Sequence, residues 1–157
     1  MSAHLAFQAP IGSIIAWSDG TPRPPERHRR KLSAWQTTNS SGRLIRKQGE
    51  HVGGSIILPA SFTLHEGDHG ASGVITIRVH RTFSLESGLR FTIVERPAIG
   101  SCRVFDRPGE HAELVHLAVN RQAAEEWLSR HGYRDAVLEV VTADEVAADV
   151  VEGRAAA

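Results

Sequence analysis

The middle of the chain alternates between apolar and polar residues, which is the pattern of antiparallel strands that bury one face. The alternation is clearest in 73–83 and 89–95, and clusters of Gly, Ser and Pro mark turns between such segments. We therefore predict a mainly antiparallel β-sheet. Its expected strands are 11–17, 43–48, 55–58, 61–65, 73–83, 89–95 and 101–105.

The final third of the chain changes to alternating strand and helix patterns. Asn120 and Thr142 are residue types that cap helix N-termini, and each precedes a helical pattern. The resulting β-α-β-α unit would form a right-handed crossover if its two strands paired in parallel. In order, its expected elements are strand 112–119, helix 121–131, strand 136–141 and helix 142–152.

Residues 21–48 follow neither pattern. Three prolines keep 21–25 extended, because each disfavours helix in the residue before it. We expect a helix over 25–37, since a proline followed by an acid suits a first turn. Its only large apolar residues, Leu32 and Trp35, lie on one face. This helix therefore has little to bury against the rest of the chain.

Together these patterns predict an α+β fold in a single domain over 1–157. A basic arm or helix occupies 21–48. A mainly antiparallel β core occupies 49–119, with barrel-like closure as one alternative. The C-terminal α/β unit occupies 120–153.

Composition excludes several classes of protein. Of 157 residues, 41% are hydrophobic and 23% are charged, which is unlike a disordered chain. No apolar run approaches the ~18 residues of a membrane span, and residues 1–4 do not resemble a secretory signal. The single cysteine, Cys102, excludes an intrachain disulfide and suits a reducing compartment. We therefore expect a cytoplasmic protein without a membrane partner.

The formal net charge is zero, but the charges are segregated along the chain. Residues 1–20 carry a net charge of −1, residues 21–48 carry +7, residues 49–105 are neutral, and residues 106–157 carry −6. Such segregation indicates an anionic partner or a polarised surface. Arginine supplies most of the positive charge, which suits phosphate contacts but would also follow from a GC-rich bacterial genome.

We expect the cations of 21–48 to contact a nucleic acid. Arginine forms bidentate hydrogen bonds with phosphate, and aromatic rings stack on bases. Trp35 would stack on a base or anchor the helix. The predicted nucleic-acid-binding residues are Arg23, Arg27, Arg29, Arg30, Lys31, Trp35, Arg43, Arg46 and Lys47. No motif of a known RNA- or DNA-binding module is present, so both polymers stay open.

One short motif matches a metalloprotease pattern. His65-Glu66-Gly67-Asp68-His69 has the form H-E-x-x-H, which binds zinc when a helix places both histidines on one face. The glycines and Asp68 oppose a helix, so we expect a hairpin loop here. His65, Glu66 and His69 stay as alternative metal ligands, and no cofactor is otherwise expected.

Three hypotheses about function follow. The first is a non-catalytic nucleic-acid-binding accessory protein, a small subunit of a ribonucleoprotein or protein–DNA complex, which binds phosphates through 21–48. The second is an assembly module whose basic segment docks on an acidic protein surface, in another protein, in a second copy or in its own chain. The third is a metal-dependent hydrolase that uses the H-E-x-x-H residues.

Overall fold

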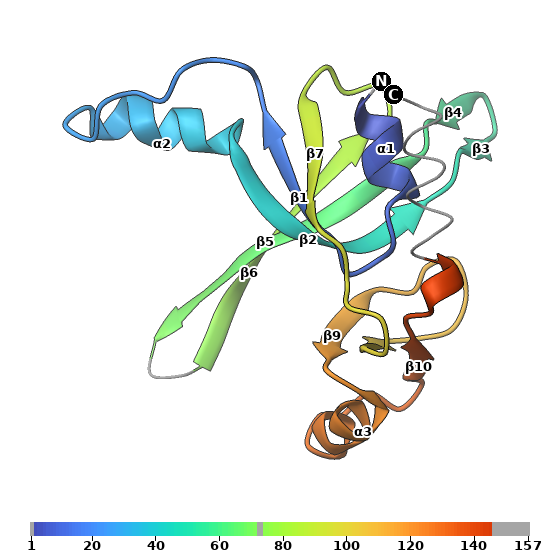
Figure 1. Cartoon of the computed structure of the whole chain (residues 1–157). Coiled ribbons are helices and arrows are strands. Elements are labelled where there is room, and N and C mark those ends of the chain that lie inside the picture. Colours follow the sequence, from blue (N-terminus) through green and yellow to red (C-terminus); the bar gives the residue numbers. More distant parts are fainter. Residues whose placement is uncertain (1, 72–73, 146–157) are drawn as a thin grey trace.

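The computed structural model describes residues 2–71 and 74–145, with the backbone alone described for 68–71 and 74–78. Short helices and antiparallel strands make up the described chain, which confirms the α+β prediction (Figure 1). In chain order the elements are α1 (Ser2–Gln8), β1 (Ile14–Ser18), α2 (Arg29–Thr37), β2 (Ser40–Gln48), β3 (His51–Gly53), β4 (Ile56–Leu58), β5 (Ser61–Ala71), β6 (Val74–Ser84), β7 (Arg90–Glu95), β8 (Cys102–Phe105), β9 (Leu114–Ala118), α3 (Arg121–Ser129) and β10 (Val137–Val140). Within the described ranges, no helix is both long and apolar enough to cross a membrane.

The larger sheet has five strands in the spatial order β6-β5-β2-β1-β7, and every neighbouring pair is antiparallel. It is an open sheet with β6 and β7 at its edges, so the barrel-like alternative is wrong. Closure would require the two edge strands to meet and hydrogen bond. Instead β5 and β6, with 11 residues each, run on together as a hairpin beyond the five-residue strand β1 (Figure 1).

Helix α1 covers one face of this sheet, and the hydrophobic pattern does not predict it. Its contact face consists of alanines three residues apart, Ala3 and Ala6, continued by Ala9, and all three are fully buried. Their small side chains bring the helix backbone close to the strands. The core beneath α1 is completed by Ile15, Trp17, Leu44, Phe62, Leu64 and Phe91.

The smaller sheet has the order β10-β8-β9 and carries α3. β8 lies between the other two strands and is antiparallel to both. Strands β9 and β10 therefore do not pair with each other, so the condition for a right-handed crossover is not met. The C-terminal unit takes its central strand from the predicted β core. All four residues of β8 are buried, as a central strand requires.

A cluster of Ile45, Phe105 and Leu114 joins the two sheets. Ile45 follows Leu44 of the α1-covered core, so the smaller sheet packs on the opposite face of β2.

Residues 143–145 begin the last predicted helix, and the Glu145 N–H donates to Thr142 Oγ1 over 3.3 Å. The rest of that predicted helix, 146–152, lies outside the described residues.

Candidate nucleic-acid interface

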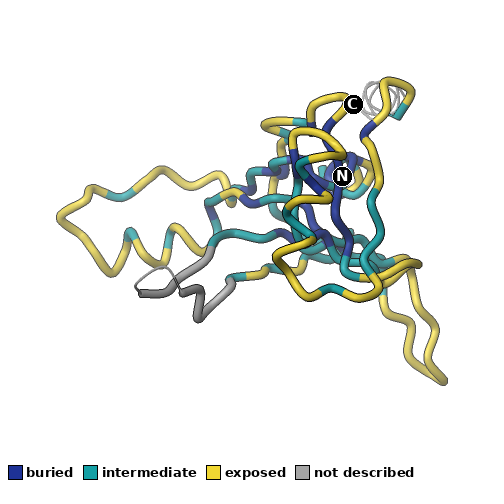
Figure 2. The backbone as a smooth tube through the Cα atoms, turned by 90° about the horizontal axis from the view of Figure 1, so that it is seen from below, coloured by how far each residue is buried: buried dark blue, intermediate teal, exposed yellow. Residues whose placement is uncertain are grey.

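The chain leaves the larger sheet after β1 and returns at β2 as an arm, which we define as residues 19–39. Figure 1 shows the arm projecting from the same side of the sheet as the β5–β6 hairpin, and Figure 2 shows most of it exposed. No residue of α2 is buried. The helix begins at Arg29 and not at residue 25, because 25–28 form a turn in which the His28 N–H donates to the Pro25 carbonyl over 3.0 Å.

A carboxylate and an amide hold the base of the arm together. Asp19 accepts hydrogen bonds from the Thr21 N–H and hydroxyl, the Thr38 hydroxyl and the Asn39 amide. Thr21 makes the largest contribution among these donors, which together hold the pKa of Asp19 well below its usual range. The Asn39 side chain also accepts from the Ser18 hydroxyl and donates to the Trp35 carbonyl. Both ends of the arm are thus fixed to each other.

Two tryptophans brace the same region. The Trp17 indole N–H donates to the Thr37 carbonyl over 3.3 Å, and the Trp35 indole N–H donates to the Thr21 carbonyl over 3.1 Å. Trp35 is half-buried and, with Trp17, lines a shallow recess of about 420 Å³ beside the arm. Trp35 thus holds α2 to the start of the arm and also lines this recess.

The cations of the arm point away from the protein. Arg29, Arg30 and Lys31 are exposed, and none makes an ion pair with any residue in 2–71 or 74–145. Arg27 donates through Nε to the neighbouring imidazole of His28 over 3.3 Å. Arg23 lies 3.6 Å from Glu26, with both side chains more than half exposed. Such an exposed pair neutralises little charge.

Arg90, at the start of β7, extends this cationic surface to the base of the arm. A Cβ on Gly20 would lie 3.4 Å from the Arg90 guanidinium carbon, and Gly20 itself has a φ of +83°. The arm therefore turns directly over the guanidinium. The sequence reasoning did not include Arg90, because it lies far from 21–48 in the chain. The sequence indicated only that Arg90 occupies a polar position in the alternating strand 89–95, so that its side chain faces solvent.

The three remaining predicted cations lie on β2, away from α2. Arg43 donates through Nη1 to the Gly12 carbonyl over 2.6 Å. The Arg46 Nε is buried and has no hydrogen-bond partner among the described residues. The Lys47 amine lies 5.8 Å from the centre of the Phe7 ring. The structure thus divides the predicted binding residues into an exposed set on the arm and a half-buried set on the sheet.

The H-E-x-x-H segment lies in β5, so the predicted hairpin loop is wrong. The chain continues as strand through Gly67 and Gly70 because β6 pairs with it along its length, with two bulges that absorb irregular positions. Glu66 accepts from Arg81 over 2.7 Å. Among the residues whose side chains are described, 2–67 and 79–145, no three His, Cys, Asp or Glu are placed to hold a metal ion. The side chain of His69, one of the alternative ligands, lies outside this set. The strand also lacks the helical spacing that the protease motif requires.

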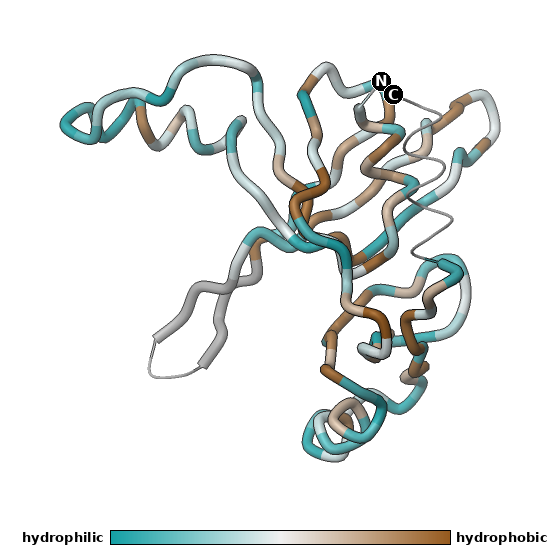
Figure 3. Tube along the Cα trace, viewed as in Figure 1, coloured by the Kyte–Doolittle hydropathy of each residue, from teal (hydrophilic) through white to brown (hydrophobic). Residues whose placement is uncertain are grey.

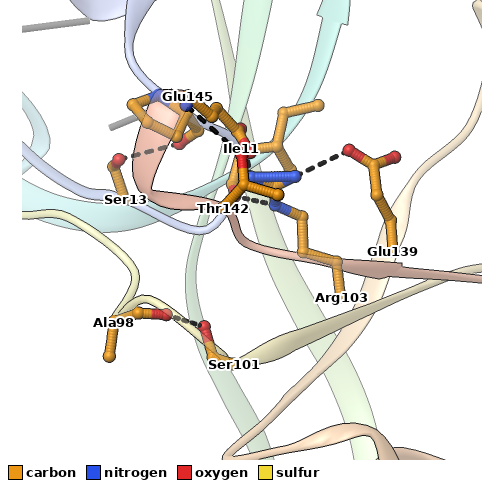
Figure 4. A network of polar contacts seen from close by, with 9 residues as sticks. Ile11, Ser13, Ala98, Ser101, Arg103, Glu139, Thr142 and Glu145 are labelled. Carbon is orange, nitrogen blue, oxygen red and sulfur yellow. Dashed lines mark hydrogen bonds and ion pairs between the residues drawn. The ribbon is translucent and has the colours of Figure 1, made fainter. Parts of the chain in front are cut away.

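Two acidic residues of the C-terminal third pair with a buried arginine, away from the arm. Figure 4 shows the guanidinium of Arg103, which is 2% exposed, between Glu139 and Glu145. Arg103 donates to Glu139 over 2.8 Å and to Glu145, and its Nε donates to the Ile11 carbonyl over 2.8 Å. The network joins the smaller sheet to the turn after α1. The arm lies at the far side of the larger sheet from it (Figure 1).

A family model described as "Uncharacterised conserved protein UCP036055" matches residues 1–145. The chain belongs to this family. Comparison with curated proteins gives no match, and comparison with solved structures gives none either. The match spans α1, the arm and both sheets, so the family model includes every part of the candidate interface.

In this family member the cations of the arm lie apart from the described acidic residues of the C-terminal third. The arm extends its cations from one side of the molecule, while the Arg103 network lies where the two sheets meet. In the described chain, the arm does not fold back on the acidic C-terminal third. The arrangement can therefore attract a polyanion from solution.

Proposed function

We propose that this protein is a non-catalytic nucleic-acid-binding accessory protein that contacts phosphates through its arm. The observation that carries this proposal is the exposure of Arg29, Arg30 and Lys31 without an ion-pair partner among the described residues. Consecutive helical positions do not face each other, so these three cations spread positive charge around the projecting helix. A nucleic-acid backbone supplies regularly spaced negative charge.

The chemistry of the arm favours phosphate as the partner. Figure 3 shows that α2 is largely hydrophilic, so little of its binding energy can come from apolar burial. Guanidinium groups match phosphate geometry and stack on bases. Arg90 at the base of the arm and the recess beside Trp35 extend the surface toward the sheet. A strand of nucleic acid could follow this path from the arm to β2.

The proposal predicts binding that weakens steeply with salt. Labelled single-stranded and double-stranded DNA and RNA, each titrated with the full chain at several KCl concentrations, would give the affinity and its salt dependence by fluorescence anisotropy. For single strands the slope of log K against log salt is about −0.7 for each phosphate contacted. If the protein bound none of the four polymers at ~50 mM salt, the result would contradict the proposal.

A second candidate function is assembly with an acidic protein, and the β3–β4 hairpin favours it. Val52, Ile56, Ile57 and Leu58 of this hairpin are each more than half exposed. Adjacent exposed aliphatic side chains mark protein interfaces more often than nucleic-acid interfaces. Chemical cross-linking in the native host separates the two functions. Cross-links that survive nuclease treatment and depend on both the hairpin and the arm would support a protein partner.

A further inference from the structure

The shallow recess beside the arm joins apolar side chains to a cationic surface. Its volume of about 420 Å³ lies within the usual range of small-ligand sites. The lining comes from β1, from β7 and from the segment 35–41, where the arm returns to β2. Among the described residues that line it, none is charged. A ligand group that fits this recess is therefore itself uncharged.

Ala16 of β1 and Val94 of β7 supply the aliphatic part of the lining. Ile15 and Trp17 belong to the core beneath α1, so Ala16 between them faces the other side of the sheet. Val94 is 62% exposed, so a ligand in the recess can still cover most of this side chain. Each aliphatic group that leaves water on binding adds to the affinity.

Two indole rings supply the aromatic part. The N–H of Trp17 donates to the Thr37 carbonyl and that of Trp35 to the Thr21 carbonyl. An indole has no other donor, so both rings offer only carbon surface to a ligand. Trp17 is 2% exposed, so the half-buried Trp35 provides most of this surface. A flat ring system suits it, because such rings stack on indole.

A cation lies at the border of the recess. The strand register places Arg90 of β7 opposite Ser18 of β1, and Ser18 lines the recess. Side chains directly opposite on neighbouring strands share one face of the sheet. Beyond Ser18 the chain continues into the arm with its exposed cations. An uncharged surface thus adjoins a cationic one, which is what a nucleotide with a flat base and a charged phosphate requires.

We propose that this recess binds an unpaired nucleobase, while Arg90 and the arm bind the phosphates beside it. The inference rests on the proposed function and narrows its partner to nucleic acid with unpaired bases. In a duplex each base is paired and stacked, so presenting one to the recess costs unstacking energy. A single strand presents its bases without that cost, and stacking accepts any base because each has a flat face.

The test compares two strands of equal length that differ only in their bases. One is a single strand of thymidines, and the other is an abasic strand with the same sugar–phosphate backbone. Fluorescence anisotropy with the full chain at one KCl concentration gives both affinities. Both strands offer phosphates to the arm, but only the first offers a base to the recess. We expect the thymidine strand to bind about tenfold more tightly, as stacking of one base allows.

Two variants that keep the charge locate this preference. Ser41 is exposed and lies opposite Ala16, so Ser41→Leu fills the recess and should bring the two affinities together. Val94→Ala removes apolar surface and should lower the preference about threefold. Val52→Ala is the matched control, because Val52 is 61% exposed but lies in the β3–β4 hairpin. Binding of the abasic strand should be the same in all three variants.

The outcomes separate this inference from the proposed function. If the wild type binds both strands equally, the arm binds backbone phosphate and the recess takes no base, so the proposed function stands and this inference fails. If the preference persists unchanged in Ser41→Leu and Val94→Ala, the base binds elsewhere and this inference also fails. If neither strand binds, the proposed function fails and the inference with it, which leaves assembly with a protein partner.

Discussion

Gly42 shows how one small residue lets the candidate site form. It lies in β2, which begins at Ser40, although the predicted strand began only at residue 43. A Cβ on Gly42 would lie 2.9 Å from the backbone oxygen of His65. Only glycine therefore allows β2 and β5 to approach closely enough to set Arg43 opposite His65.

We expect Gly42→Ala to destabilise the protein by about 1–3 kcal/mol, because the clash is with backbone and cannot be relieved by rotating a side chain. Gly49→Ala is the matched control, since a Cβ there meets nothing within 4 Å. Urea denaturation of both variants and the wild type gives the difference in unfolding free energy. Equal stability of the two variants would contradict the close approach.

Asp19 gives a prediction about pH. Its folded-state pKa is lowered, so the stability it contributes is present above the unfolded pKa of about 4 and is lost as the pH falls from there toward the lower folded value. The wild type should therefore exceed Asp19→Asn in melting temperature at pH 7, and this difference should shrink below pH 4. Thermal unfolding from pH 7 to pH 2 measures it. A difference that does not change with pH would argue against the ionised contacts.

At the scale of elements, the Arg103 network joins the smaller sheet to the turn after α1. The partners differ in burial: the guanidinium is 2% exposed, while the side chains of Glu139 and Glu145 are 56% and 33% exposed. The group that stays behind after a substitution determines the cost, because a buried charge without a counter-charge is unfavourable. Removing the acids should therefore cost more than removing the base.

We expect Glu139→Gln combined with Glu145→Gln to destabilise the protein by about 3 kcal/mol, and Arg103→Met by about 1–2 kcal/mol. The two carboxylates left by Arg103→Met can be hydrated, whereas the guanidinium left by the double change cannot. Urea denaturation at pH 7 compares the three proteins. The reverse order of stability would contradict this account of the network.

Local patterns predicted the strands near 73–83 and 89–95, because their alternation is set by one buried face. They missed α1, whose contact face is made of alanines that carry little hydrophobic signal. They also broke β5 at the glycines of the H-E-x-x-H segment, where pairing with β6 overrides local preference. The position of β8 between β9 and β10 depends on pairing between distant segments, which no local pattern contains.

The candidate site was predictable in the same uneven way. The arm cations are adjacent in the chain, so counting charges by segment finds them. Arg90 reaches the base of the arm only because β7 pairs with β1, which places Arg90 opposite Ser18. The sequence therefore indicated where the positive charge lies, and the fold adds which side chains share a surface.

At the scale of the whole molecule, the arm and the described part of the acidic C-terminal third, residues 106–145, lie on different sides (Figure 1). The net charge of zero is therefore the sum of positive and negative regions that lie apart on the surface. The proposed polyanion would bind at the arm, although the molecule as a whole carries no net charge.

The most direct test of this account compares two triple variants that lose the same charge. The first variant changes three arm residues: Arg29→Gln, Arg30→Gln and Lys31→Gln. The second changes three exposed residues in and after α3: Arg121→Gln, Arg130→Gln and Arg134→Gln. Binding of single-stranded oligonucleotides is measured by fluorescence anisotropy across KCl concentrations. We predict that the arm variant binds at least about tenfold more weakly, with a salt slope smaller by about 2, and that the α3 variant binds like the wild type. Equal loss of binding in both variants, or in neither, would contradict a nucleic-acid interface on the arm.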